Sequence, residues 1–273
     1  MKGMKYLFSA IVVLGLVFGA WVEARAQGEI TLLAIGPMRA PTQKVIANFE
    51  AKTGRKVKVT YGNGNESRRM VAQGQAQDVS IIIGPFPGAV SSRSIIPSSA
   101  TPIATVQWVF AVPKGRPKPD ISNAAAVKKA ILAAKWIGFE DPDFTIAGQG
   151  PLEALTKLGI ADQMLERSQV ELGPGARGVP PTNPNTVKTI TRLINGDIDI
   201  ALHWLNDLVA EKDKYEIVGL LPKDVATPTP VVGFISSNAS DPAGAKALLD
   251  HLASAESQAI WKEAGYGAPS PRS

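Results

Sequence analysis

The stretch of sequence that decides the fold is "ITLLAIGPMRAPTQKVIANFEAKTG", residues 30–54. It opens with an apolar run at 30–35, breaks at Gly36-Pro37, and continues with apolar residues at helical spacing over 43–52. This pattern predicts a strand, a tight loop and a helix. Because the first amides of a helix attract negative charge, the loop between strand and helix is a candidate anion site.

The segments that follow repeat the order of strand and helix. An alternating strand is expected at 57–61, a second helix at about 67–72, and "DVSIIIG" (78–84) is expected to be a strand without a polar face. Strands that are apolar along their whole length are typical of parallel sheets covered by helices on both sides. The order therefore predicts an open α/β sheet with right-handed crossovers.

Two Pro-rich segments interrupt this alternation and indicate passages between two lobes. They are "VQWVFAVPKGRPKP" and "LLPKDVATPTPVVGFIS", and each joins an apolar strand to a proline-containing stretch. The resulting organisation is a first lobe at 27–111, a second lobe at 112–228, and a return to the first lobe at 229–273. A cleft between two such lobes is a natural ligand site. A single larger sheet with long loops is the alternative.

The N-terminus has the pattern of a secretory signal peptide at 1–26. Lys2 and Lys5 precede an apolar stretch at 6–22, and Ala24-Arg25-Ala26 supplies a small-x-small cleavage site. The alternative is an uncleaved anchor, but the apolar stretch is shorter than the roughly 20 residues of a spanning helix. We therefore expect a mature chain that begins at Gln27 and is periplasmic.

The composition excludes several classes of function. The chain has no cysteine, so we expect neither a disulfide nor thiol chemistry. The mature residues carry 26 basic and 23 acidic side chains, a net charge of +3, and no basic run contains interleaved aromatic residues. This argues against binding of nucleic acid. We expect a monomer without a cofactor.

Several segments together resemble the molybdate-binding, type II periplasmic solute-binding family of ABC importers. The resemblance rests on "FEDPDFTIAGQGPLEALTKLGI", "NTVKTITRLINGDIDIALHWLND" and "SDPAGAKALLDHLASAESQAIWKEAGY", and on "FEAKTGRKVKV" and "GQAQDVSIII" near the start. It covers nearly the whole mature chain in the same order. It implies a two-lobed α/β fold in which each lobe is an open mixed sheet flanked by helices, with two crossover segments. It also implies a membrane permease and a cytoplasmic ATPase as partners.

The family binds a tetrahedral oxyanion, such as molybdate or tungstate, on four loops near helix N-termini. Transferred to this sequence, the resemblance implies a set of ligand-binding residues in these loops and in an aromatic wall: Gly36, Met38, Arg39, Asn63, Asn65, Ala147, Thr186 and Trp204. We expect no resident metal, although the ligand itself could be a metal oxyanion.

The sequence departs from the family pattern at the site. Pro37 stands where the family has a serine, Asn63 and Asn65 replace serines, and Trp204 replaces a tyrosine. "GPMRAP" also adds Arg39, whose guanidinium pairs well with a carboxylate. An organic carboxylate therefore competes with an oxyanion as the ligand. A sensor protein that is not coupled to transport is a further alternative.

An enzyme is not expected from these residues. There is no Gly-x-Ser-x-Gly motif, no nucleotide-binding Gly-rich loop with its lysine, and only two histidines. "EDPD" (140–143) clusters acids, but we interpret it as a turn, and we interpret His203 as structural. A ferric-iron receptor is not expected either, because Tyr61, Tyr215 and Tyr266 form no adjacent pair.

Overall fold

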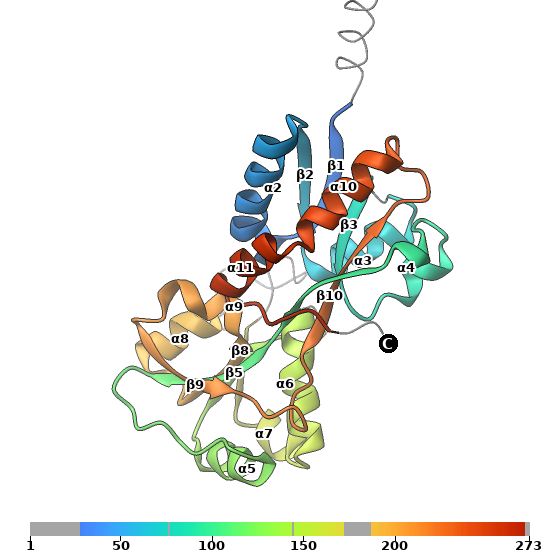
Figure 1. Cartoon of the computed structure of the whole chain (residues 1–273). Coiled ribbons are helices and arrows are strands. Elements are labelled where there is room, and N and C mark those ends of the chain that lie inside the picture. The colour runs from blue at the N-terminus through green and yellow to red at the C-terminus, as the bar shows by residue number, and fades with distance from the viewer. Residues whose placement is uncertain (1–27, 76, 144, 172–186, 271–273) are drawn as a thin grey trace, which may run out of the picture.

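The computed structural model describes residues 28–75, 77–143, 145–171 and 187–270. It forms two lobes, each built on one five-stranded mixed sheet (Figure 1). This confirms the predicted α/β fold. The expected signal peptide at 1–26 lies outside the described residues. None of the helices in the described ranges is both long and apolar enough to cross a membrane.

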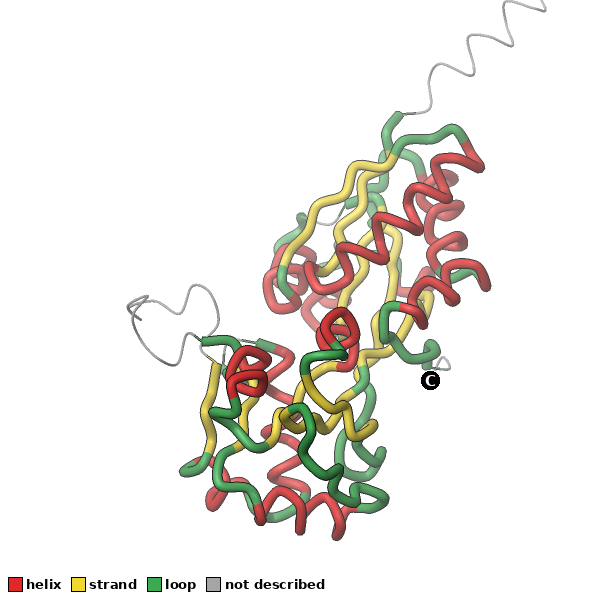
Figure 2. The backbone as a smooth tube through the Cα atoms, turned by 90° about the vertical axis from the view of Figure 1, so that its left-hand side faces the viewer, coloured by secondary structure: helices red, strands yellow, loops and turns green. Residues whose placement is uncertain are grey.

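Lobe 1 contains both ends of the described chain, and its sheet has the strand order β2-β1-β3-β10-β4. Strands β1, β2 and β3 are parallel, whereas β10 runs antiparallel to β3 and β4. Figure 2 shows helices on both sides of this sheet. Its elements are β1 (Ile30–Ile35), η1 (Gly36–Met38), α2 (Arg39–Thr53), β2 (Val57–Gly62), α3 (Gly64–Ala72), β3 (Val79–Ile83), α4 (Pro87–Ser91), η2 (Pro97–Ser99), β4 (Thr101–Val106), β10 (Thr229–Ile235), α10 (Pro242–Leu252) and α11 (Ala255–Glu263).

Lobe 2 is the middle of the chain, and its sheet has the order β7-β6-β8-β5-β9. Strands β6, β7 and β8 are parallel, and β5 runs antiparallel to β8 and β9. Its elements are β5 (Trp108–Pro113), α5 (Ala124–Ala133), β6 (Ile137–Glu140), α6 (Ile146–Lys157), α7 (Ala161–Leu165), β7 (Ser168–Glu171), α8 (Thr189–Asn195), β8 (Ile200–Trp204), α9 (Leu205–Leu208), η4 (Val209–Glu211) and β9 (Tyr215–Leu220).

The chain passes from lobe 1 to lobe 2 at Gln107, between β4 and β5, and returns through 221–228. The first passage comes before the expected boundary at 111, because 108–111 already pair with β8 of lobe 2. The segment after α11 touches lobe 2 and then pairs with lobe 1. A Cβ atom on Gly265 would lie 2.9 Å from Cα of Asn206 in α9, and Gly267 pairs with Thr105 in β4.

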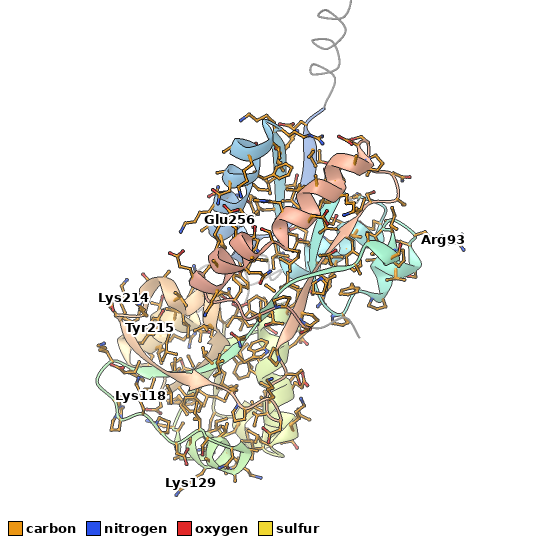
Figure 3. The ribbon with its side chains drawn as sticks, viewed as in Figure 1. Arg93, Lys118, Lys129, Lys214, Tyr215 and Glu256 are labelled. Atoms are coloured by element: carbon orange, nitrogen blue, oxygen red, sulfur yellow. The ribbon has the colours of Figure 1, made fainter. Side chains whose placement is uncertain are left out.

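Local sequence explains where the helices begin and end. Helix α2 ends at Gly54, which has φ 70°, and α8 ends at Gly196, which has φ 77°. Glycine is favoured at such left-handed C-cap positions because it has no Cβ atom to clash. Lys52 on α2 forms an ion pair with Glu256 on α11, and Figure 3 labels Glu256 beside α2. The helices from the two ends of the chain are thus joined.

The carboxylate of Asp78 joins three segments of lobe 1. It accepts hydrogen bonds from the backbone N–H and hydroxyl of Thr31, at 2.8 and 2.7 Å, and from those of Ser240, at 2.7 and 3.0 Å. The residue is only 6% exposed. It therefore fixes the strand β1 to the start of β3 and to the return segment.

Replacing Asp78 with alanine is expected to lower the free energy of unfolding by about 3 kcal/mol, because buried N–H and O–H groups lose a charged acceptor. Burial alone would raise the pKa of Asp78, but the hydrogen bonds from Thr31 and Ser240 lower it below its ordinary value. The stabilisation is therefore present above the ordinary carboxyl pKa and is lost as the pH falls through the lowered value.

Urea unfolding of Asp78→Ala at several pH values measures this contribution. Asp213→Ala, at an exposed position in lobe 2, is the control and should unfold like the parent protein. Equal stability of the two variants at neutral pH would show that Asp78 does not hold these segments together.

Candidate functional site

The first predicted loop lies between β1 and α2, at the edge of lobe 1. Gly36 begins the 3-10 turn η1, and a Cβ atom on it would lie 3.6 Å from the carbonyl oxygen of Gly62, so the first and second loops are neighbours. The guanidinium carbon of Arg39 lies 3.9 Å from the centroid of the Tyr61 ring, and Arg39 is exposed. Met38, in contrast, is fully buried, so its side chain points into the core.

The second predicted loop is closed by a capping box at the start of α3. The Asn63 side chain accepts a hydrogen bond from the Glu66 amide at 2.8 Å, and the Glu66 carboxylate accepts one from the Asn63 amide at 3.2 Å. Asn65 lies in the first turn of the same helix. Two amides that could face an anion are therefore already paired within the helix start.

The third predicted loop forms the N-terminus of α6 in lobe 2. The hydroxyl of Thr145 accepts a hydrogen bond from the amide of Gly148 at 2.9 Å, and Ala147 is 5% exposed. A Cβ atom on Gly64 of α3 would lie 2.5 Å from Cδ1 of Ile146. The N-termini of α3 and α6 therefore meet, and we call the surface around this contact and the contact of Gly265 with Asn206 the interlobe seam.

The predicted aromatic wall is a buried pair of tryptophans in lobe 2. Trp204 at the end of β8 is 4% exposed, and its ring centroid lies 5.7 Å from that of Trp108. The structure thus brings the first three loops together at the interlobe seam and places Trp204 in the adjoining core of lobe 2. Asn185 and Thr186 of the fourth loop lie outside the described residues.

Several buried polar atoms have no hydrogen-bond partner within the described ranges. Buried polar groups in proteins are almost always paired, so such atoms mark places where water or a ligand completes the network. Two of them lie on elements that form the interlobe seam, namely Oγ of Ser67 on α3 and Oδ1 of Asn206 on α9.

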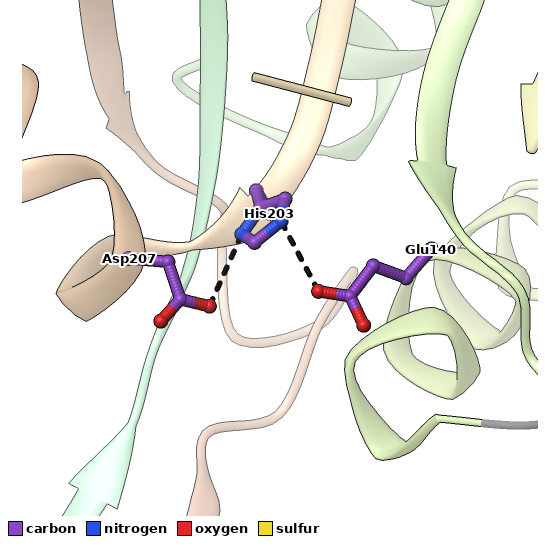
Figure 4. Close-up of side chains that lie close together, drawn as sticks. All are labelled: Glu140, His203 and Asp207. Atoms are coloured by element: carbon purple, nitrogen blue, oxygen red, sulfur yellow. Dashed lines mark ion pairs between the residues drawn. The ribbon is translucent and has the colours of Figure 1, made fainter. Parts of the chain in front are cut away.

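A cluster of titratable side chains stands at the ends of strands in lobe 2. His203 on β8 lies between Glu140, the last residue of β6, and Asp207 on α9 (Figure 4). Its Nε2 is 3.4 Å from Oε1 of Glu140, and its Nδ1 is 3.4 Å from Oδ2 of Asp207. The His203 side chain is 5% exposed, whereas the carboxylates are 22% and 24% exposed. The histidine is therefore buried, whereas the two acidic side chains are only partly exposed.

The cluster shifts the pKa values of its members in different directions. Burial alone would lower the pKa of His203, but the hydrogen bond to Glu140 and the charges of Asp207 and Glu140 raise it to about 9. Burial raises the pKa of Asp207 to about 6, against the opposing charge of His203. Burial alone would also raise the pKa of Glu140, but the hydrogen bond with His203 lowers this pKa below its ordinary value. Glu140 is therefore ionised at neutral pH.

One contact opposes the second proton on His203. The amide of Trp204 lies 3.0 Å from Nδ1 and donates a hydrogen bond to that nitrogen when it carries no proton. The two carboxylates favour the charged ring, and in a buried site a charge pair outweighs one neutral hydrogen bond. We therefore expect His203 to be protonated at neutral pH.

The same three residues could each offer one metal ligand, and these atoms lie within 4.8 Å of one another. A metal ion, however, would bind only one nitrogen of the ring, whereas each carboxylate here approaches a different nitrogen. The arrangement therefore suits the holding and transfer of a proton better than the binding of a metal.

The sequence carried signals for this cluster that our interpretation did not use. Glu140 opens the "EDPD" turn, and His203 and Asp207 lie four residues apart in "HWLND". Each residue follows or ends an apolar strand run, which is where functional side chains of α/β sheets gather. Only the fold shows that β6 and β8 are neighbours in the sheet.

A separate pocket of about 700 Å³ lies between the lobes near the second passage of the chain. It is lined by the loop 84–87, by Val90 and Ser91, by 227–230, and by Glu153 of α6. None of the predicted ligand residues lines it. Its prolines and Phe86, with one carboxylate, offer little to an anion, so we do not place the site there.

Comparison with known proteins gives the chain a family. A family model described as bacterial extracellular solute-binding protein matches residues 30–267. A curated relative, an aconitate isomerase from a Pseudomonas species, is 24% identical over 250 residues, which is 89% of this chain and 89% of the relative.

Solved structures of binding proteins share the two-lobed fold. The substrate-binding domain of a putative molybdenum ABC transporter from Clostridium difficile has a TM-score of 0.71 at 18% identity, over 88% of this chain and 98% of that one. The periplasmic molybdate-binding protein of Azotobacter vinelandii has a TM-score of 0.64 at 17% identity, over 89% and 100%.

The aconitate isomerase overturns the expectation that this chain is no enzyme. That expectation rested on the lack of a nucleophile motif, a metal cluster and a nucleotide loop. An isomerisation by proton transfer needs none of these features, because a positioned carboxylate or histidine is sufficient as acid or base. The lack of those motifs argues against hydrolases and nucleotide-dependent enzymes, but it does not argue against an isomerase.

Proposed function

Because the chain belongs to the bacterial extracellular solute-binding proteins, we propose that it captures a small organic carboxylate between its two lobes outside the cytoplasm. The single observation that carries this proposal is Arg39, an exposed arginine held over Tyr61 beside the start of α2. A guanidinium can form two parallel hydrogen bonds with one carboxylate.

The second loop favours a carboxylate over a tetrahedral oxyanion of the molybdate type. An oxyanion needs a donor for each oxygen when it is buried. Pro37 has no amide to donate, and the amides of Asn63 and Glu66 already pair with each other's side chains. The backbone at this end of lobe 1 therefore offers few free donors.

The charge distribution across the interlobe seam also favours an extended ligand. Lobe 1 presents Arg39, whereas lobe 2 presents the carboxylates of Glu140 and Asp207. An oxyanion carries negative charge on every side, so the carboxylates of lobe 2 would repel it wherever it lies near them. An organic acid separates its charged ends by a carbon skeleton, so one carboxylate can bind Arg39 while its carbon atoms lie against lobe 2.

In this proposal the ligand stabilises the closed arrangement because it contacts both lobes. A membrane permease with its cytoplasmic ATPase would then accept the closed form, in the way the resemblance to importers implies.

The second candidate function is an enzyme that acts on an unsaturated tricarboxylate, as the name of the aconitate isomerase suggests. The cluster of Glu140, His203 and Asp207 is the observation that favours it.

A thermal-shift screen tests the proposal with residues 27–273. At about 100 times its dissociation constant a ligand adds about 2.7 kcal/mol to the stability of the protein. For a protein of this size that corresponds to a rise of about 5–10 °C in melting temperature. We expect this rise with cis- or trans-aconitate, citrate or tricarballylate, and we expect none with molybdate, tungstate or sulfate.

Replacing Arg39 with alanine is expected to weaken carboxylate binding about 10- to 100-fold, because a charged hydrogen bond is lost. Lysine should restore only part of the affinity, since it lacks the planar fork. The stability of the empty protein should fall by no more than about 1 kcal/mol, the value of an exposed cation–π contact. Calorimetric titration measures both effects, and unchanged affinity in Arg39→Ala would move the site elsewhere.

A further inference from the structure

Three titratable side chains stand together in lobe 2 without a structural task that requires all of them. His203 is held by Glu140 on one nitrogen and by Asp207 on the other (Figure 4). One carboxylate would be sufficient to pair a buried imidazolium. The presence of a second carboxylate and the partial exposure of both acidic side chains need another explanation.

Both carboxylates border the interlobe seam. Glu140 is close to the N-terminus of α6, where its carboxylate also pairs with Thr145 and where Ile146 meets Gly64 of lobe 1. Asp207 follows Asn206, which contacts Gly265 of the return segment. A ligand held between the lobes at α3 and α6 would therefore lie beside the turn of lobe 2 that begins with Glu140.

The environment shifts the pKa values of Glu140 and Asp207 in opposite directions. Glu140 is kept ionised by the charged ring of His203, whereas burial raises the pKa of Asp207 to about 6. Titratable groups whose pKa values are pushed apart within one site are the usual mark of acid–base chemistry. Among the groups that face the cluster, Glu171 on β7 and Lys188 before α8 also act on it.

We propose that Glu140 is a catalytic base that moves a proton between two carbons of an unsaturated organic acid bound at the interlobe seam. This inference rests on the proposed function. His203 is a positioning residue that orients Glu140 through Nε2, and Asp207 holds the other nitrogen of the ring.

The proton transfer is balanced within the ligand. The Glu140 carboxylate removes a proton from a CH₂ group next to a C=C bond. The electron pair of the broken C–H bond forms a new double bond, and the electrons of the old double bond pass to the conjugated carboxylate, which Arg39 would face. Glu140 then returns the proton to the carbon of the old double bond that lies farther from the original CH₂ group. The product is an isomer, and no oxidant, reductant or other reactant is needed.

The test uses residues 27–273 and trans-aconitate in D₂O, followed by proton NMR, with calorimetric titration of the same ligand in parallel. We expect the parent protein to bind the ligand, to exchange its CH₂ and vinyl protons for deuterium, and to produce the cis isomer. Tricarballylate has the same three carboxylates without a double bond and should bind without exchange.

Glu140→Gln should reduce the exchange rate at least about 100-fold, in line with the usual contribution of a general base, while the dissociation constant changes little. Glu140→Asp should restore part of the rate because the base is retained. Glu153→Gln, on α6 but away from the cluster, is the matched control and should exchange like the parent.

His203→Gln should slow the exchange and also move its pH profile. The rate falls at low pH when the base takes a proton. Because His203 lowers the pKa of Glu140, its removal should shift this acid limb to higher pH, which a merely structural role would not do. Thr145 and Lys188 also lower the pKa of Glu140 and stay in place.

The outcomes separate the two proposals. Binding of trans-aconitate without exchange would overturn the catalytic inference and leave a receptor. Absence of binding by every organic acid would overturn the proposed function and the inference with it. Exchange that persists in Glu140→Gln would show that another group is the base and would contradict the assignment.

Discussion

Replacing Gly64 with phenylalanine is expected to weaken the binding of an organic acid at least about 100-fold, while the melting temperature of the empty protein barely changes. Gly64 begins α3 in lobe 1, and a Cβ atom there would lie 2.5 Å from Cδ1 of Ile146 in lobe 2. Alanine at this position would displace only the flexible end of Ile146. A phenyl ring is too large for the contact and would hold the lobes apart.

The size of the effect follows from the energy of closure. If the ligand binds tightly only when both lobes contact it, blocking closure removes the contribution of one lobe. A loss of about 2.7 kcal/mol corresponds to a 100-fold weaker affinity. Stability should fall only by the small contribution of the Ile146 contact, because each lobe keeps its own sheet.

Gln73→Phe is the matched control for this experiment. It places the same ring on an exposed residue at the other end of α3 and should bind ligand like the parent. Shortening Ile146 to alanine in the Gly64→Phe background should recover part of the affinity. If Gly64→Phe binds the ligand as well as the parent does, the ligand does not lie between the lobes.

Replacing Gly148 with alanine is expected to lower the free energy of unfolding by about 3 kcal/mol or more. A Cβ atom there would meet the carbonyl oxygen of Glu140 and would lie 2.5 Å from both the carbonyl carbon of Asp141 and the nitrogen of Pro142. These are backbone atoms, which cannot move aside as a side-chain end can. Overpacking of this kind usually costs about 1–3 kcal/mol, and more where nothing can yield.

This substitution should also disturb the cluster in lobe 2, because the turn that it displaces carries Glu140. Chemical denaturation measures the stability. The low-pH side of the pH profile of the deuterium exchange rate reports on the protonation of Glu140. Gly36→Ala is the control for stability, since its Cβ atom would meet only the carbonyl of Gly62 at an ordinary 3.6 Å. Equal stability of Gly148→Ala and Gly36→Ala would contradict the tight packing described here.

The fold could be predicted because its signals are local. Apolar strands such as "DVSIIIG" and the glycines at 54 and 196 mark elements without reference to the rest of the chain. The start of α2 was less clear. The helix begins at Arg39 rather than near Gln43, because Pro41 in its first turn has no intrahelical hydrogen bond to lose.

The passage between the lobes could not be predicted as well. Strands β4 and β5 are separated by Gln107 alone, and the sequence is apolar on both sides of it. The composition therefore gives no mark where the chain leaves one sheet and enters the other, and the proline-rich stretch that suggested a boundary comes only after β5.

The predicted ligand-binding residues stay a prediction, although the structure places the first three of their loops side by side. The order Asn63-x-x-Glu66 is a signature of a capping box, and it could have shown that these side chains pair with the helix start. The cluster in lobe 2 could not be foreseen in the same way. Glu140 and His203 are distant in sequence and meet only because β6 and β8 pair in the sheet.

Isothermal titration calorimetry of residues 27–273 with trans-aconitate and with molybdate, under identical conditions, tests the central claim most directly. We expect saturable binding of one trans-aconitate per chain and no heat of binding from molybdate. Saturable binding of molybdate, together with no binding of trans-aconitate, would contradict this claim.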